Sequence, residues 1–254
     1  MREAGALARK LTSKPLEVQT KGQLGPVTNV DFAVDALVAE MLQAARPDYG
    51  WLSEESPDDP AQRMDAARTF MIDPIDGTAA MIAKAPQWTI SLGIVEGERP
   101  FAGAIYNPMT DEMYLGADGV QATLNGRPVA ASVRTSLEGA TMVGQRFRFS
   151  DRRWKTPWPA MQIVERQSIA YRLATVASGQ ADATALFGWK NDWDVAAGAA
   201  IVAAAGGRVS DLWGAPLQLN QQRPRVPGVA AAGAALHPLL IERTAAFPDP
   251  RLSS

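Results

Sequence analysis

The first third of the chain combines two helical patterns with short apolar strands. Apolar residues recur at helical spacing over 1–11 and again from Ala33 to Ala45, where Thr28 stands at the expected capping position. The polar stretch 14–26 between them contains two glycines and two prolines, which predicts a connecting segment. We then predict a strand ending at 51–53, a polar, proline-containing loop over 56–62, and a strand over 69–72 that stops at Asp73-Pro74.

Strands dominate the middle of the chain and alternate with helices after it. We predict a meander of strands over 88–95, 101–106, 112–115 and 120–124, closed by the hairpin signal Asn125-Gly126. Further strands are expected over 141–147, 182–186, 208–211 and 228–232, and helices over 169–178, 195–205 and 236–246. The sequence shows no internal repeat.

Composition excludes several classes of function. The 254 residues are 46% apolar, which is enough for a buried core, and 25 basic against 27 acidic residues give a net charge of −2. This balance creates no global field for nucleic acid or an anionic membrane. The absence of cysteine excludes disulfides and thiolate chemistry, and no apolar run approaches the roughly 20 residues that span a bilayer. We therefore expect a cytoplasmic monomer or homodimer that recognises a small molecule locally.

Three acidic clusters, 52–55, 73–78 and 193–198, carry the candidate chemistry. Each pairs a carboxylate with a change of chain direction, and carboxylate and carbonyl oxygens are the ligands that Mg²⁺ prefers. Within the second cluster, Pro74 fixes one backbone angle, Gly77 tolerates a sharp turn, and the next residues can open a helix whose amides face an anion. Taken singly, each cluster also fits a plain turn, a solvated edge or a helix cap.

In combination, the clusters resemble the inositol monophosphatase family. Its signatures are a Glu-Glu pair, Asp-Pro-Ile-Asp-Gly-Thr and Trp-Asp-x-Ala-x-Gly in this order, and residues 73–78 match the second in all six positions. The resemblance runs from about Lys21 to the final strand and includes 26–31 and Gly206-Gly207. It implies an α/β (α+β) layered sandwich of the inositol monophosphatase and fructose-1,6-bisphosphatase type. The half 1–133 would carry most metal ligands, and the half 134–254 would carry Asp194 and the specificity residues.

The resemblance also implies a metal-activated phosphomonoesterase without a covalent intermediate. Two Mg²⁺ ions and a third, weaker one would be held by Glu54, Glu55, Asp73, the carbonyl of Ile75, Asp76 and Asp194. Asp73 would bridge the first two ions, and inhibition by lithium is expected.

Glu54 and the Thr78 hydroxyl would activate the attacking water, with Asp31 orienting Thr78. A capping box from Thr28 to Asp31 explains that aspartate equally well and does not exclude the first role. The backbone amides of Gly77 and Thr78 would hold the phosphoryl oxygens.

Substrate preference is suggested by the position seven residues before Asp194. Inositol phosphatases typically carry a glutamate there, whereas this chain has Phe187, which can pack on a flat ring. The run 187–194 and Ser53-Glu54-Glu55 resemble bacterial 3'(2'),5'-bisphosphate nucleotidases, which convert 3'-phosphoadenosine 5'-phosphate, a by-product of sulfate assimilation, to AMP and phosphate. Three cations are candidates for binding the second phosphate, although each also fits a solvated surface charge: Arg172, Lys190 and Arg146.

Alternative interpretations remain open at this level. One is an inositol or sugar monophosphatase, and another is a catalytically idle regulator that binds RNA or protein through the basic, aromatic segment 146–155. That segment fits a solvated loop or a lid over an anionic substrate as well. Lys21 fits either contact with the metal site or a loop charge, whereas His237 is interpreted as structural. Residues 79–81, Ala-Ala-Met, replace the polar and aromatic residues common in relatives, which puts substrate fit on that side in doubt.

Overall fold

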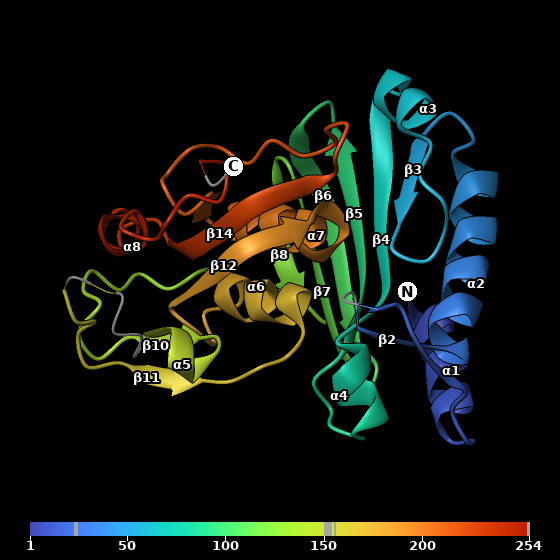
Figure 1. Cartoon of the computed structure of the whole chain (residues 1–254), viewed down its shortest axis with the longest axis horizontal. Helices are drawn as coiled ribbons and strands as arrows, with labels where there is room; N and C mark the ends of the chain where they lie inside the picture. Colours follow the sequence, from blue (N-terminus) through green and yellow to red (C-terminus); the bar gives the residue numbers. More distant parts are fainter. Residues whose placement is uncertain (23–24, 150–153, 155, 253–254) are drawn as a thin grey trace.

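Two large β-sheets stacked with layers of helices organise the chain, and a two-stranded sheet is the third (Figure 1). The computed structural model describes residues 1–22, 25–149, 154 and 156–252. Helices α1 (Arg2–Thr12) and α2 (Asn29–Ala45) cover the outer face of the first sheet, and α6 (Ile169–Ala177) and α7 (Asp192–Ala204) lie between the two sheets. Helix α8 (His237–Thr244) packs on the second sheet. This arrangement is the layered sandwich that the resemblance implied.

The first sheet has seven strands in the order β3-β4-β5-β6-β7-β8-β9. Strands β3 and β4 are parallel, and every later neighbour is antiparallel, which confirms the predicted meander. The bounds are β3 (Gly50–Ser53), β4 (Arg68–Asp76), β5 (Thr89–Glu96), β6 (Arg99–Asn107), β7 (Glu112–Ala117), β8 (Val120–Leu124) and β9 (Arg127–Pro128).

The second sheet has five strands in the order β11-β10-β12-β14-β13. Strand β12 pairs in parallel with β10 and antiparallel with β14, so this sheet is mixed. The bounds are β10 (Thr141–Val143), β11 (Gln162–Val164), β12 (Ala183–Asn191), β13 (Gly207–Ser210) and β14 (Arg225–Gly233). Among the described residues, no helix is both long and apolar enough to cross a lipid bilayer.

Several local predictions were wrong for identifiable reasons. The stretch 14–26, predicted as a connecting segment, contains strand β1 (Val18–Thr20) and the first residue of β2 (Pro26–Thr28), and these two strands pair in antiparallel orientation. The polar loop 56–62 contains the start of helix α3 (Pro60–Asp65), which the side chain of Asp59 caps and which begins with proline at its first position. The strand expected over 141–147 ends at Val143, and the short helix α5 (Arg146–Phe149) follows it.

Helix α7 approaches the first sheet closely because glycines line its path. A Cβ atom placed on Gly93 would lie 2.7 Å from Cβ of Ala196, and one on Gly103 would overlap the carbonyl of Ala197. Both glycines belong to central strands, β5 and β6, which contact α7 along its length. The close approach also brings the start of α7 to strand β4, where the second acidic cluster lies.

We predict that Gly103→Ala lowers the stability of the folded protein by about 1–3 kcal/mol, because the added methyl group must displace α7. Chemical denaturation of the variant and the wild type measures the difference. Ala104→Ser, a change of similar size on the next, half-buried residue of the same strand, is the control and should cost less. Equal stability of Gly103→Ala and the wild type would contradict the tight packing of α7.

Candidate active site

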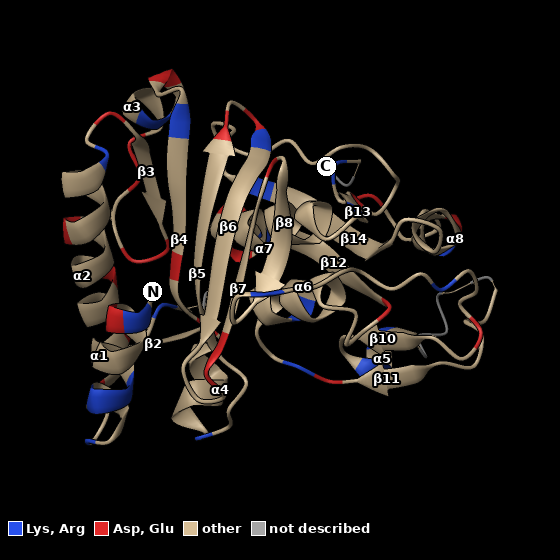
Figure 2. Ribbon diagram, turned by 180° about the vertical axis from the view of Figure 1, so that it is seen from behind, with Lys and Arg blue, Asp and Glu red and all other residues tan. Residues whose placement is uncertain are grey.

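The three acidic clusters predicted from the sequence converge where β3, β4 and α7 meet. Burial raises the pKa of Asp73 well above its usual range, and the negative charges of Glu54, Asp76 and Asp194 raise it further. Burial also raises the pKa of Asp194 well above its usual range, and the negative charges of Asp76 and Glu54 raise it further. Figure 2 colours acidic positions on α2, on the loop after β3 and on β4, three elements that lie on the same side of the first sheet's strand β5. Carboxylates from distant parts of the sequence therefore share one poorly solvated volume.

A bulge in β4 shapes the second cluster. The pairing of β4 with β5 runs without interruption to Asp73 and resumes at Asp76, so strand β4 continues past the point where we predicted that it stops. Pro74 lies inside the irregularity, where it removes no ladder hydrogen bond. The backbone N–H of Ile75 donates to Oδ1 of Asp73 at 3.0 Å. The bulge thus changes the direction of the Asp73 and Asp76 side chains, as bulges beside active sites commonly do.

Thr78 begins the short helix α4 (Thr78–Ile82) and joins it to α2. Its hydroxyl lies 2.9 Å from Oδ1 of Asp31 and 3.0 Å from the carbonyl oxygen of Ile75. Oδ2 of Asp31 accepts hydrogen bonds from the N–H and the hydroxyl of Thr28, so the capping box is present as well. Both contacts considered for Asp31 occur together, one on each of its oxygens. Gly77, at φ +99°, makes the turn into α4.

Lys21 lies against the Glu54-Glu55 pair. Its ammonium is 3.6 Å from Oε1 of Glu54 and forms a closer ion pair with Oε2 of Glu55. Burial raises the pKa of Glu54 to about 7 against the opposing effect of Lys21. Asp35, one helical turn after Asp31 on α2, accepts a hydrogen bond from the hydroxyl of Ser53 at the end of β3. Sequence reasoning missed Asp35, although its spacing of four from Asp31 places both on one face of the helix.

Asp76 is held by the start of α6. The Ser168 hydroxyl and the backbone N–H of Ala170 donate to Oδ2 of Asp76 at 2.6 and 2.5 Å, and the backbone N–H of Ile169 donates to Oδ1 at 3.1 Å. Ser168 also caps α6. The carboxylate therefore occupies the position at a helix N-terminus that favours an anion. Ser168 was missed because no local pattern links it to Asp76, which lies 92 residues earlier.

The donor set fits a divalent cation in chemistry. The carboxylates that repel one another here are those of Glu54, Asp73, Asp76 and Asp194. Their oxygen atoms are the ligands that hard divalent ions prefer, and a bound cation would relieve their mutual repulsion. Their present orientations serve other partners: among residues 1–22, 25–149, 154 and 156–252, no three Asp, Glu, His or Cys side chains are arranged to hold one ion. Asp73 and Asp194 each accept one backbone N–H on a single carboxylate oxygen, which leaves their other oxygen as a donor for a cation.

Two of the three predicted cations lie beside the acids. The positive charge of Arg172 acts on Asp76, and that of Lys190 acts on Asp194. Arg172 is 7% exposed and donates to the carbonyl of Arg166 at 2.6 Å. The Lys190 ammonium donates to the carbonyls of residues 187, 188 and 189 at 2.8–3.3 Å and spans the bulge of β12.

The two remaining candidates, Phe187 and Arg146, are engaged with other parts of the protein. Phe187 is 6% exposed, and its ring packs against Phe149, Trp154 and Phe247, so the expected packing on a flat ligand has little surface available. Arg146 is exposed and donates to the carbonyl of Ile163 on the edge strand. In the basic, aromatic segment, residues 150–153 and 155 lie outside the described residues. His237 is buried against Ser210, as its structural interpretation requires.

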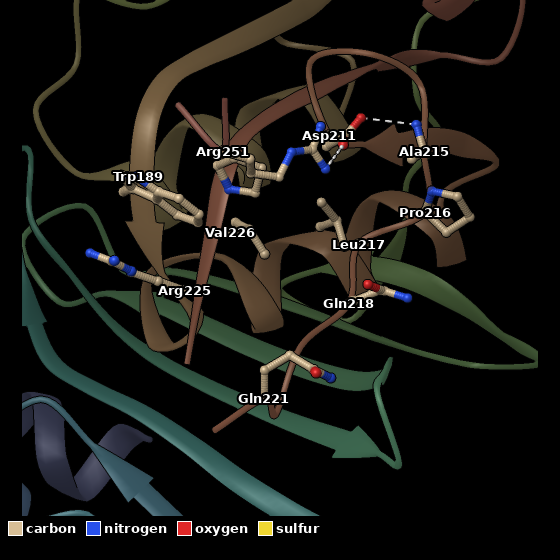
Figure 3. Close-up of a pocket in the computed structure, with 11 residues that line it drawn as sticks. Trp189, Asp211, Ala215, Pro216, Leu217, Gln218, Gln221, Arg225, Val226 and Arg251 are labelled. Atoms are coloured by element: carbon tan, nitrogen blue, oxygen red, sulfur yellow. Dashed lines mark hydrogen bonds and ion pairs between the residues drawn. The ribbon is translucent and has the colours of Figure 1, made fainter. Parts of the chain in front are cut away.

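A pocket of about 350 Å³ in the C-terminal half is separate from this site (Figure 3). The guanidinium of Arg225 stacks 4.4 Å from the ring centre of Trp189, and Arg251 is paired with Asp211. None of the acids predicted as metal ligands lines it. The pocket therefore adds nothing to the acidic site.

Comparison with known proteins agrees with the geometry. The family model described as the inositol monophosphatase family matches residues 1–246. An inositol-1-monophosphatase of Synechocystis is 33% identical, covering 97% of this chain and 86% of that protein. The 3'(2'),5'-bisphosphate nucleotidase CysQ of Escherichia coli is 31% identical, covering 81% of this chain and 84% of that protein. A crystal structure of the extragenic suppressor protein suhB of Bartonella henselae superposes with a TM-score of 0.82 at 26% identity, covering 95% and 94% of the two chains. The chain belongs to the inositol monophosphatase family, whose members are phosphoric monoester hydrolases and are generally Mg²⁺-dependent.

Proposed function

We propose that this protein hydrolyses a small phosphate monoester with water, in a reaction that depends on Mg²⁺ held by the converging carboxylates. The observation that supports this best is the burial of Asp73 among the charges of Glu54, Asp76 and Asp194. Without a bound cation, such crowding lowers the stability of the folded protein, because the buried carboxylates repel one another. A divalent ion among them removes that cost and creates a place for a phosphate oxygen.

The ligand assignment follows the family resemblance. Glu54, Asp73 and the carbonyl of Ile75 would hold one ion, Asp73, Asp76 and Asp194 would hold a second, and a third, weaker ion would lie near Glu54 and Glu55. Bound Mg²⁺ lowers the pKa of an attacking water and stabilises the charge that develops on the leaving oxygen.

The Thr78 hydroxyl and Asp31 act on the attacking water. Thr78 has one proton and two acceptors, Asp31 and the carbonyl of Ile75, at nearly equal distances. Donation to Asp31 leaves the hydroxyl lone pairs free to accept a hydrogen bond from water, and Glu54 takes the proton. The amides of Gly77 and Thr78, at the start of α4, orient the phosphoryl oxygens.

For the substrate, our first choice is a nucleoside 3',5'-bisphosphate such as 3'-phosphoadenosine 5'-phosphate. Lys190 places a positive charge beside Asp194, which suits a second phosphate, and a relative at 31% identity carries this nucleotidase name. Because Phe187 is buried, we assign base recognition to other residues. An inositol monophosphate is the second candidate, supported by the relative at 33% identity that spans 97% of the chain.

We predict Mg²⁺-dependent release of inorganic phosphate from at least one of these two substrates, and its inhibition by Li⁺. Asp194→Asn should lower kcat/KM by about 100-fold or more, because an amide binds Mg²⁺ far less well than a carboxylate. Asp65→Asn, an exposed change at the end of α3, is the control. Absence of phosphate release from both substrates would favour a binding protein over an enzyme.

A second prediction concerns stability without metal. In the presence of a chelator at mildly alkaline pH, Asp73→Asn should stabilise the protein by about 0.5–2 kcal/mol, because it removes one of several repelling buried charges. The same variant should lose the rise in Tm that Mg²⁺ gives the wild type. Asp118→Asn, on an exposed turn, should do neither. A lower Tm of Asp73→Asn in chelator would argue against strong repulsion in the site.

The preference for a second phosphate predicts a difference between two nucleotides. We expect kcat/KM for 3'-phosphoadenosine 5'-phosphate to exceed that for 3'-AMP roughly ten-fold to a hundred-fold, the range of a charge-assisted hydrogen bond. Lys190→Met should reduce this ratio, while Arg208→Met, which removes an exposed charge on β13, should leave it unchanged. Equal rates for the two nucleotides in the wild type would shift the choice to a monophosphate.

A further inference from the structure

A buried arginine joins the loop after β3 to the C-terminal half of the chain. The side chain of Arg63, on α3, is 0% exposed. Its Nε and Nη2 donate to the two carboxylate oxygens of Asp58 at 2.8 and 3.0 Å. Its Nη1 donates to Oδ1 of Asn220 at 2.6 Å, and Nη2 also donates to the carbonyl of Gln221 at 3.1 Å. One guanidinium therefore links the loop after β3 to the segment before β14.

Asn220 extends this link to the start of α7. Its backbone N–H donates at 2.7 Å to Oδ2 of Asp192, the first residue of the helix. Asp192 is fully buried, and its other oxygen has no hydrogen-bond partner within the described part of the chain. Asn220 adopts φ +62°, a conformation that asparagine tolerates better than most residues. The orientation of the Asp192 carboxylate thus depends on the placement of Asn220.

The network touches both segments that carry proposed metal ligands. Asp58 follows Glu54 and Glu55 in the loop after β3, and Asp194 follows Asp192 within the first turn of α7. The backbone N–H of Leu219 also donates to the carbonyl of Glu98 at 3.0 Å, which ties the same segment to the turn between β5 and β6. Movement of Arg63 would therefore change the distance between α7 and the loop after β3, which carries Glu54 and Glu55.

We propose that Arg63, with Asp58 and Asn220, is a positioning device that fixes Asp194 relative to Glu54 and Glu55. The inference rests on the proposed function, because it requires these acids to share metal ions. A planar guanidinium suits this role: it bonds both oxygens of one carboxylate and still reaches two further acceptors, which a lysine ammonium cannot do in the same geometry.

The test uses Asn220→Gly, which keeps the left-handed backbone and the N–H that reaches Asp192 but removes the acceptor of Arg63. Mn²⁺ binding to the full chain, followed by the paramagnetic signal of free Mn²⁺, should weaken about ten-fold, the range seen when groups behind metal ligands are removed. Arg63→Lys should weaken it similarly although the charge is kept. The Mg²⁺ concentration for half-maximal activity should rise in parallel, with kcat at saturating Mg²⁺ little changed.

Val38→Ala, a core truncation on α2, is the matched control for lost stability and should bind Mn²⁺ as the wild type does. If Asn220→Gly and Arg63→Lys lose Tm but keep wild-type Mn²⁺ affinity, the network only stabilises the fold and the proposal is wrong. Failure of the wild type itself to bind Mn²⁺ would be a separate result, which overturns the proposed function and this inference with it.

Discussion

Repulsion among carboxylates held out of water is the constraint on which the rest of the structure depends. Asp73 and Asp76 lie on strand β4 and Asp194 lies on helix α7, yet the charges of Asp76 and Asp194 raise the pKa of Asp73, and the charge of Asp76 raises the pKa of Asp194. The nearest compensating charges, Lys21, Arg172 and Lys190, lie at the margins of the group. The net charge of the whole chain is close to zero, so this electrostatic repulsion is confined to the acidic site. Such a site persists only if the surrounding fold holds the charges together.

The fold supplies that support by close packing and by polar links between its halves. Glycines on β5 and β6 let α7 lie directly on the first sheet, and the start of α6 binds Asp76 through Ser168 and two backbone amides. These contacts leave little room for the acids to separate. Asp73, Asp76 and Asp194 therefore lie where strand β4 meets the starts of α6 and α7.

The acidic clusters could be predicted from the sequence because each is a short, contiguous motif, and the meander was visible from its alternation and its Asn125-Gly126 turn. Two kinds of feature could not be predicted from the sequence. Ser168 and Arg63 act through partners far away in the sequence, which no local pattern encodes. Phe187 was interpreted from its chemistry alone, whereas its environment is an aromatic cluster formed by later segments of the chain. The helix α3 was missed because its capping aspartate and proline also fit a loop.

The central claim is that the buried carboxylates form a divalent-metal site, and it is tested most directly by locating the ions. Crystals grown with Mn²⁺ and measured for anomalous scattering should show peaks between Glu54, Asp73, Asp76 and Asp194. Crystals without a peak among these side chains, at Mn²⁺ concentrations that support activity, would contradict the account.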